Sequence, residues 1–182
     1  MPGKISLFVP GPTNMPDRVR QAMDISNEDH RAPGMDKFWH PLINDLKKVF
    51  ETTSAQPIIF PGTGSSGWEA ALTNLLSKGD KVLSARFGHF SHLWIEMCKK
   101  LHIEVEEVDL EWGSGTPHDE FEKILSEDKD HNIKAVLVTH NETSTGVTND
   151  VKATRDLLNN LNHPALLLSL IHISEPTRQK PI

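Results

Sequence analysis

The feature that most constrains the fold is an alternation of short apolar runs with segments of helical spacing. Residues 133–139 form the clearest apolar run, and a helix is predicted after it at about residues 149–161. Residues 81–85 and 165–168 are further predicted strands. Several of these runs are apolar at successive positions, as expected of strands buried on both faces. The alternation predicts an α/β fold with a mainly parallel sheet flanked by helices.

The remaining elements are predicted from shorter patterns. Helices recur where apolar residues return every three or four positions, and strands where β-branched residues cluster. They comprise strands at residues 58–60 and 103–108 and helices at residues 17–23, 38–52, 68–76, 92–101 and 121–125.

Composition and charge exclude several functions. Hydrophobic residues make up 37% and charged residues 24% of the 182-residue chain, as in folded, soluble proteins. A net charge of −6 without a Lys/Arg cluster argues against nucleic-acid binding. No apolar run is long enough to span a membrane, and no signal peptide is visible. Cys98 is the only cysteine, which excludes an internal disulfide and a cysteine-based zinc site.

A glycine-rich turn precedes the helix predicted at residues 68–76. Residues 61–67 read Pro-Gly-Thr-Gly-Ser-Ser-Gly. Glycine lets the backbone approach a ligand, and the N–H groups of a helix start attract anions, so the turn is a candidate cradle for a phosphate monoester. An ordinary turn is the alternative, because Ser66 and Glu69 have the spacing of a capping box. The turn lacks the P-loop and dinucleotide-binding motifs, so nucleotides are not favoured.

A second polar loop follows the strand at residues 133–139. Residues 139–147 read Thr-His-Asn-Glu-Thr-Ser-Thr-Gly-Val. Ligands in parallel sheets bind at the carboxyl ends of the strands, where both loops are expected. His140 alone is more typical of a structural histidine than of a catalytic one.

Taken together and in order, the two loops resemble those of the class V aminotransferases, which use pyridoxal 5′-phosphate (PLP). Residues 29–33, 68–74 and 163–168 are similar to the serine–glyoxylate and alanine–glyoxylate members of that family. The resemblance runs from about Leu7 to Leu168. It implies an incomplete large domain of the fold-type I PLP-dependent transferase fold. It also implies a parent enzyme that transfers an amino group from serine or alanine to glyoxylate, giving glycine.

The resemblance implies roles for individual residues. Thr63, Gly64 and Ser65 match the family's phosphate-binding positions. Phe90 matches the aromatic ring that stacks on the pyridine of PLP, although a core phenylalanine is the alternative there. Thr143 matches the residue that hydrogen-bonds the phenolic oxygen of PLP.

Substrate-pocket residues are less specifically marked. Gly11, His30 and Arg31 are candidates, although the charged cluster around His30 is also explained by a solvated loop. His30 and Arg31 would line either this subunit's pocket or that of a partner subunit. The full-length enzyme is expected to be a homodimer, peroxisomal in eukaryotic relatives and otherwise cytoplasmic.

The resemblance stops at Leu168. The family continues with an aspartate that pairs with the pyridine nitrogen and, later, with the Schiff-base lysine. Here the aspartate position is Leu170, and Lys180 has no following structure to position it. We therefore expect residues 1–168 to be the N-terminal segment and first half of the PLP-binding domain. Residues 169–182 resemble translated sequencing-adapter sequence and are expected to be an artefactual tail, and the chain as it stands to have no catalytic residue and no activity.

Two other interpretations remain open. One is an inert or partner-binding fragment, and the other is a different α/β protein that binds a sugar phosphate or a nucleotide. In the tail, residues 170–173 have a composition that permits a strand, and coil is expected from Glu175 onward.

Overall fold

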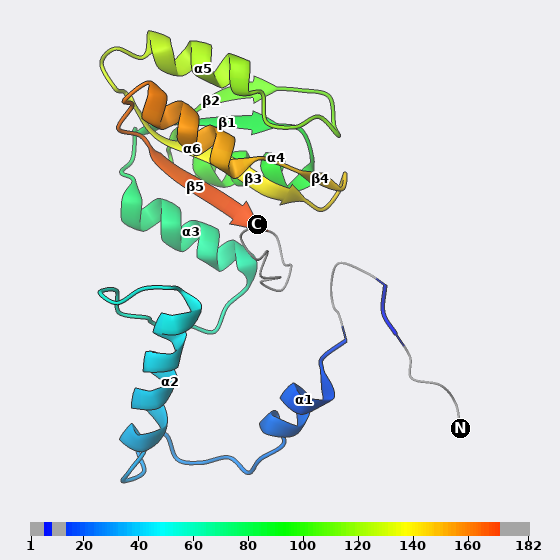
Figure 1. The fold of residues 1–182 in the computed structure, drawn as a ribbon, viewed down its shortest axis with the longest axis vertical. Helices are drawn as coiled ribbons and strands as arrows, with labels where there is room; N and C mark the ends of the chain where they lie inside the picture. Colours follow the sequence, from blue (N-terminus) through cyan, green and yellow to red (C-terminus); the bar gives the residue numbers. More distant parts are fainter. Residues whose placement is uncertain (1–5, 9–13, 172–182) are drawn as a thin grey trace. The chain divides into compact units, whose positions relative to one another are not determined.

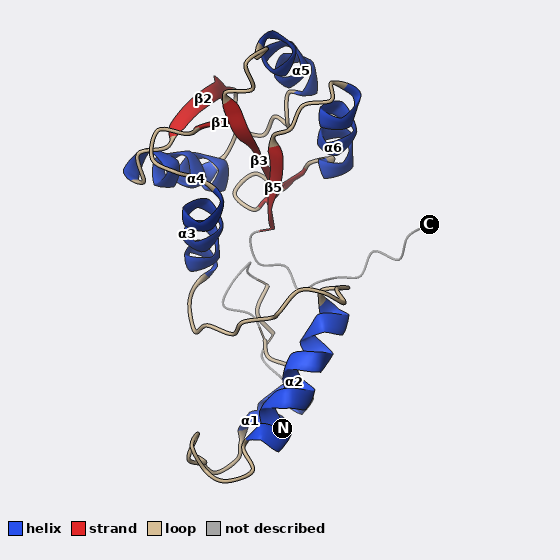
Figure 2. Cartoon of the chain, turned by 90° about the vertical axis from the view of Figure 1, so that its left-hand side faces the viewer, coloured by secondary structure: helices blue, strands red, loops and turns tan. Residues whose placement is uncertain are grey.

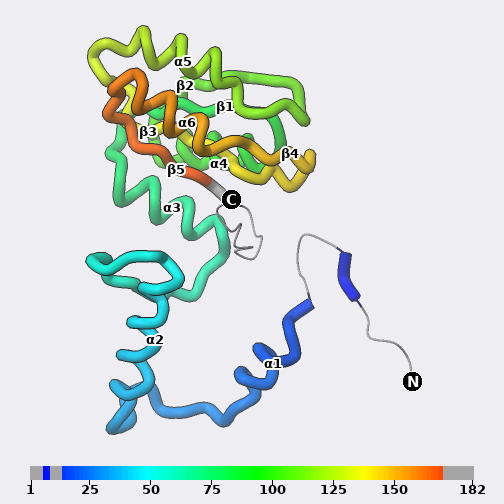
Figure 3. Tube along the Cα trace, viewed as in Figure 1, coloured from blue at the N-terminus to red at the C-terminus, as the bar shows by residue number. Residues whose placement is uncertain are grey.

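The computed structural model describes residues 6–8 and 14–171 and divides into two compact units, Met1–Pro61 and Gly62–Ile182. The first unit contains α1 (Asp17–Met23), with the predicted bounds, and α2 (Asp36–Val49), which begins two residues and ends three residues before the predicted helix at residues 38–52 (Figures 1 and 3). Neither helix has a buried side chain among the described residues. Gly11 and Lys180 lie outside the described residues.

The strand predicted at residues 58–60 is wrong. These residues have no regular secondary structure, and Ile58 and Phe60 are exposed. A strand needs a neighbouring backbone to pair with its N–H and C=O groups, and no described segment of the first unit supplies one. β-branched composition alone does not make a strand, because strand propensity depends on context.

The second unit is a sheet covered by helices on both faces (Figures 1 and 2). Its elements, in chain order, are α3 (Gly64–Leu75), β1 (Lys81–Arg86), α4 (His89–Lys100), β2 (Glu104–Asp109), α5 (His118–Glu127), β3 (Ile133–Glu142), β4 (Val147–Thr148), α6 (Val151–Asn160) and β5 (Leu166–Ile171). Parallel pairs join β2 to β1, β1 to β3 and β3 to β5. The two-residue strand β4 pairs antiparallel with the end of β3. This confirms the predicted α/β fold with a mainly parallel sheet.

Two cores lie on opposite faces of the sheet. Helices α3 and α4 cover one face and α5 and α6 the other, and Figure 2 shows the two pairs on either side of the strands. Successive residues of β3 serve different cores: Val136 and Val138 pack toward α5 and α6, whereas Ala135 and Leu137 pack toward α3 and α4. The strand is therefore buried on both sides, as its unbroken apolar run predicts.

Helices α3 and α4 begin earlier than the sequence predicts. α3 starts at Gly64 rather than Trp68, with Thr63 as its N-cap residue. Ser66 consequently lies inside the first turn, and the capping box with Glu69 is wrong: no side chain caps this helix start. Glycines and serines are weak helix formers in a helix interior, but they are well tolerated in a first turn.

Strand β3 is longer than predicted. The prediction ends the strand at Thr139 and begins a polar loop at His140, but β3 continues to Glu142 because Asn141 and Glu142 pair with β4. β5 likewise continues past Leu168 to Ile171, paired with β3 throughout. Residues 172–182, including those expected as coil, lie outside the described residues.

Candidate functional site

Two helix starts lie together at the carboxyl edge of the sheet. α3 and α4 pack through Trp68 and Trp94, whose ring centroids are 6.0 Å apart. Each ring lies about one turn after the start of its helix, so the two starts are neighbours. In Figure 1 the arrows of β1 and β5 point toward the side on which α3 begins. The carboxyl edge is the ligand-binding edge of such sheets.

The start of α3 carries the residues predicted to bind phosphate. Thr63 has an extended backbone (φ −91°, ψ 170°), and Gly64 and Ser65 open the helix. Among the described residues, no acceptor receives the backbone N–H of Gly64 or Ser65. A Cβ placed on Gly64 would have no described atom within 4 Å apart from the adjoining residues and the backbone of its own helix. Open N–H groups, two hydroxyls and free space beside the backbone suit a phosphate dianion.

The start of α4 is instead occupied by the protein itself. Glu142 Oε2 accepts hydrogen bonds from the backbone N–H of Phe90 (3.0 Å) and of Ser91 (2.9 Å). The N–H of His89 donates to Ser144 Oγ (2.9 Å). A side-chain carboxylate therefore neutralises the positive end of this helix. Of the two neighbouring helix starts, α3 is the one open to an external anion.

Glu142 is fully buried. Its Oε1 accepts hydrogen bonds from Ser144 Oγ (2.6 Å) and Ser144 N (3.2 Å). Burial raises the pKa of this carboxyl, but the hydrogen bonds from Ser144, Ser91 and Phe90 outweigh burial and hold the pKa below its ordinary value. The residue therefore stays ionised and serves as an acceptor for every donor around it.

Thr143 lies in the tight turn between β3 and β4 and is half-buried. The Glu142 carbonyl accepts hydrogen bonds from Gly146 N (2.8 Å) and Thr145 N (3.3 Å), and the positive φ of Gly146 (74°) lets the chain turn back. Glu142 thus precedes Thr143 in the chain and holds the backbone of Phe90 with its side chain. The structure brings Phe90 and Thr143 to the same edge of the sheet.

Phe90 has two neighbours that bear on its assignment. It is half-buried and packs against the core between α3 and α4, as the alternative reading of a core residue requires. Its ring also meets the His89 ring edge-on, with centroids 5.4 Å apart. A ring that is only partly covered by its own core retains surface for a flat ligand.

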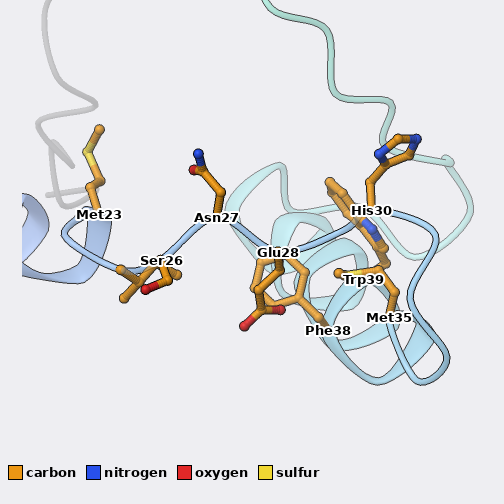
Figure 4. Close-up of a pocket in the computed structure, with 9 residues that line it drawn as sticks. Met23, Ser26, Asn27, Glu28, His30, Met35, Phe38 and Trp39 are labelled. Atoms are coloured by element: carbon orange, nitrogen blue, oxygen red, sulfur yellow. The ribbon is translucent and has the colours of Figure 1, made fainter.

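His30 and Arg31 belong to the first unit. The His30 side chain is 76% exposed, with Nδ1 3.8 Å from Asp29 Oδ1. It lines a pocket of about 330 Å³ together with Phe38 and Trp39 (Figure 4). Arg31 donates its backbone N–H to Asp29 Oδ1 (2.9 Å). Their role in a substrate pocket stays a prediction.

Sequence reasoning missed Glu142, Gly88 and Ser144. The signal was present at Gly88: a glycine before a helix offers no capping side chain, so the first-turn N–H groups need a distant acceptor. Glu142, at the end of a buried strand, is such an acceptor, but it lies 52 residues from Phe90 in the chain.

Metal and membrane sites have no support in the described residues. Within residues 6–8 and 14–171, no three His, Cys, Asp or Glu side chains are grouped to hold a metal ion. No described helix is long and apolar enough to cross a bilayer.

The chain is similar to known aminotransferases. The family model described as Aminotransferase class-V matches residues 5–168. The chain is 52% identical over 161 residues to an L-aspartate–glyoxylate aminotransferase of Paracoccus denitrificans (strain Pd 1222), covering 88% of this chain and 41% of that protein. It is 53% identical over 162 residues to a serine–glyoxylate aminotransferase of Hyphomicrobium methylovorum, covering 89% and 40%.

A solved structure shares the fold. An alanine–glyoxylate aminotransferase from Nostoc sp. superposes with a TM-score of 0.73 at 27% identity, covering 88% of this chain and 41% of that one. The chain therefore spans about two fifths of the length of these relatives, at 40–41% coverage.

Proposed function

Because the chain belongs to the class V aminotransferase family, we propose that it is part of a PLP-dependent enzyme that transfers an amino group from serine or alanine to glyoxylate, giving glycine. The observation that carries this proposal is the open start of α3 beside the closed start of α4. Relatives named for aspartate, serine and alanine as amino donors all share glyoxylate as the acceptor. Glyoxylate is therefore the better-supported half of the substrate pair.

The described residues would hold PLP at three points. Gly64 and Ser65 would give backbone N–H groups to the phosphate, with hydroxyls from Thr63 and Ser65. The Phe90 ring would cover one face of the pyridine. The Thr143 hydroxyl would donate to the phenolic oxygen. When bound, PLP supplies the electron sink for bonds at the amino-acid Cα, and these residues orient it.

The substrate pocket and assembly are part of the same proposal. Gly11, His30 and Arg31 would line the pocket of one subunit or the other in a homodimer. Arg31 would attract the carboxylate that amino acids and glyoxylate share, because a guanidinium pairs with a carboxylate through two parallel hydrogen bonds. The enzyme would be peroxisomal in a eukaryotic source and cytoplasmic otherwise. Eukaryotic sources are considered because a relative from Arabidopsis thaliana is 49% identical to the chain.

The 182-residue chain would not itself turn over substrate. Position 170, where the family has its aspartate, is leucine and carries no carboxylate to keep a pyridine nitrogen protonated. Lys180 lies between Gln179 and Pro181, in the stretch after residue 168 that the family model does not match. We propose that residues 169–182 are foreign to the family sequence, and sequencing the transcript beyond the codon for Leu168 tests this directly.

The test of the function is an acceptor comparison. The chain, completed beyond Leu168 from the parent transcript, is loaded with PLP and given serine or alanine with glyoxylate or with 2-oxoglutarate. We expect glycine formation from glyoxylate at rates far above those with the other acceptor. A strong preference for 2-oxoglutarate would reject the substrate assignment while leaving the cofactor assignment in place.

A second candidate function is that of a different phosphate-binding α/β protein. It rests on the same start of α3, because the N–H groups there would contact only the phosphate and so would not distinguish PLP from other phosphate ligands. Titrating the 182-residue chain with pyridoxine 5′-phosphate and with AMP separates the two. Pyridoxine 5′-phosphate has the ring, phenolic oxygen and phosphate of PLP but no aldehyde to react with surface lysines. Tighter binding of AMP would favour the second candidate.

A further inference from the structure

One buried side chain connects two of the residues assigned to the cofactor. Glu142 precedes Thr143 in the chain, and its carboxylate accepts the backbone N–H of Phe90. Phe90 and Thr143 come from different elements, α4 and the turn after β3. We propose that Glu142 is a positioning residue of the cofactor site, which sets the spacing between the Phe90 ring and the Thr143 hydroxyl. This proposal rests on the proposed function, which assigns those two contacts.

The contacts of Glu142 require a carboxylate rather than any polar group of its size. Its two oxygens accept hydrogen bonds from the N–H groups of Phe90, Ser91 and Ser144 and from the Ser144 hydroxyl, so each of these partners among the described residues is a donor. A carboxylate offers about four lone-pair positions, whereas an amide offers one acceptor oxygen and an NH₂ that would face these donors. In Glu142→Gln the NH₂ group would replace one acceptor oxygen, so at least one of these hydrogen bonds must be lost.

Ser144 extends the same connection. Its Oγ donates to Glu142 Oε1 (2.6 Å) and accepts the N–H of His89 (2.9 Å). The first three N–H groups of α4, those of His89, Phe90 and Ser91, are therefore all held from the end of β3. Helix α4 cannot move along its axis without breaking these three hydrogen bonds. They therefore fix the position of Phe90 relative to the turn between β3 and β4.

The phosphate cradle does not depend on this connection. Thr63, Gly64 and Ser65 belong to α3, and among the described residues none of them contacts Glu142 or Ser144 through a hydrogen bond. Loss of the carboxylate should therefore weaken binding of the ring more than binding of the phosphate. A merely structural role for Glu142 would weaken both ligands alike.

The experiment uses equilibrium dialysis on the 182-residue chain with two probes, pyridoxine 5′-phosphate and inorganic phosphate. The proteins are the parent, Glu142→Gln, Ser144→Ala and the control Glu122→Gln, which removes a charge from an exposed position on α5. We expect Glu142→Gln to raise the Kd for pyridoxine 5′-phosphate about tenfold, as loss of an outer-shell partner commonly does. The Kd for inorganic phosphate should stay unchanged, Ser144→Ala should show a smaller effect of the same kind, and the control should match the parent.

The outcomes separate the two proposals. Equal affinity of parent and Glu142→Gln for pyridoxine 5′-phosphate, or a parallel loss of both probes, overturns the positioning role and leaves the function standing. A parent that binds neither probe overturns both. If Glu142→Gln does not fold, Ser144→Ala decides, because it removes one donor and leaves the carboxylate with its backbone partners.

Discussion

A Cβ placed on Gly88 would lie 2.4 Å from both Cγ and Cδ of Glu142, well inside van der Waals contact. The backbone of Gly88 is extended (φ −179°), a conformation that any residue adopts, so the need for glycine here comes from the carboxylate alone. The close approach of these two residues is what allows Glu142 to reach the start of α4.

Gly88→Ala should destabilise the protein by about 2 kcal/mol, the usual cost of adding a methyl group to a filled site. The measurement is the free energy of unfolding in urea. Gly67→Ala is the matched control, because a Cβ at Gly67 meets no other atom within 4 Å and alanine favours the helix there. An unchanged free energy for Gly88→Ala would mean that Glu142 is not packed against Gly88 in solution.

Gly64→Val should weaken PLP retention in the enzyme completed beyond Leu168, and Glu69→Gln should not. A valine at the start of α3 would fill the space beside the N–H groups that a phosphate must approach, at a position where a Cβ has no described neighbour within 4 Å outside the adjoining residues and its own helix backbone. Dialysis against buffer, followed by absorbance of the remaining cofactor, compares the two variants. Equal PLP content in Gly64→Val and the parent would remove the phosphate assignment.

Asp128 should contribute stability that is lost in acid. Burial raises the pKa of this carboxyl, but hydrogen bonds from the N–H groups of Ile133 (2.8 Å) and Asn132 (2.9 Å), with His163 Nε2 at 3.3 Å, hold it below its ordinary value. A group with a lowered folded-state pKa stabilises the fold fully above its unfolded pKa of about 4, and less as pH falls through the folded value.

Urea midpoints of the parent and Asp128→Asn, measured from about pH 6 down to about pH 3, should therefore converge as the pH falls. Asp119→Asn, at an exposed position on α5, is the control for loss of a surface charge. A constant difference between parent and Asp128→Asn across this range would show that the ionised form is not the stabilising one.

Cys98 should be unreactive in the folded protein. It lies on the inner face of α4, fully buried in the core that α3 and α4 form with the sheet, and burial raises the pKa of its thiol to about 12, so almost no thiolate exists near neutral pH. Iodoacetamide should leave the native mass unchanged and add one carbamidomethyl group in urea, since the chain has one cysteine. Rapid labelling without denaturant would show that the core between these helices opens readily.

The chain as it stands should form no covalent PLP adduct at a single site. Under the proposal that residues 169–182 are foreign to the family sequence, PLP would be held only through non-covalent contacts. After incubation with PLP and reduction with borohydride, intact mass should show no stoichiometric pyridoxyl group on one buried lysine, whereas the completed enzyme should carry one. A single such adduct with turnover in the 182-residue chain would contradict the proposal for residues 169–182.

Much of the second unit is predictable from local patterns. The run at residues 133–139 predicted a buried strand because its only polar residues are Lys134 and the last residue, Thr139, and the glycine turn marked the start of a helix. The strand at residues 58–60 failed because a strand depends on a pairing partner that no local pattern reveals.

The capping of α4 by Glu142 was not predicted from the sequence, for a related reason. Gly88 shows that a cap is missing, but the acceptor comes from Glu142, far along the chain, and only the register of β3 beside β1 brings it there. The same limit applies to helix starts, since Thr63 and Gly64 become N-cap and first helical residue through their backbone angles and not through residue type.

The hydrogen bonds that α4 donates to Glu142 come from the backbone N–H groups of Phe90 and Ser91. These hydrogen bonds therefore do not require a particular side chain at position 90. We expect another aromatic residue at position 90 to leave these backbone hydrogen bonds in place. The ring that the proposed function assigns to the pyridine of PLP and the backbone contacts that hold its helix are therefore separate features, so the electronic character of that ring would change without a change in the contacts that position it.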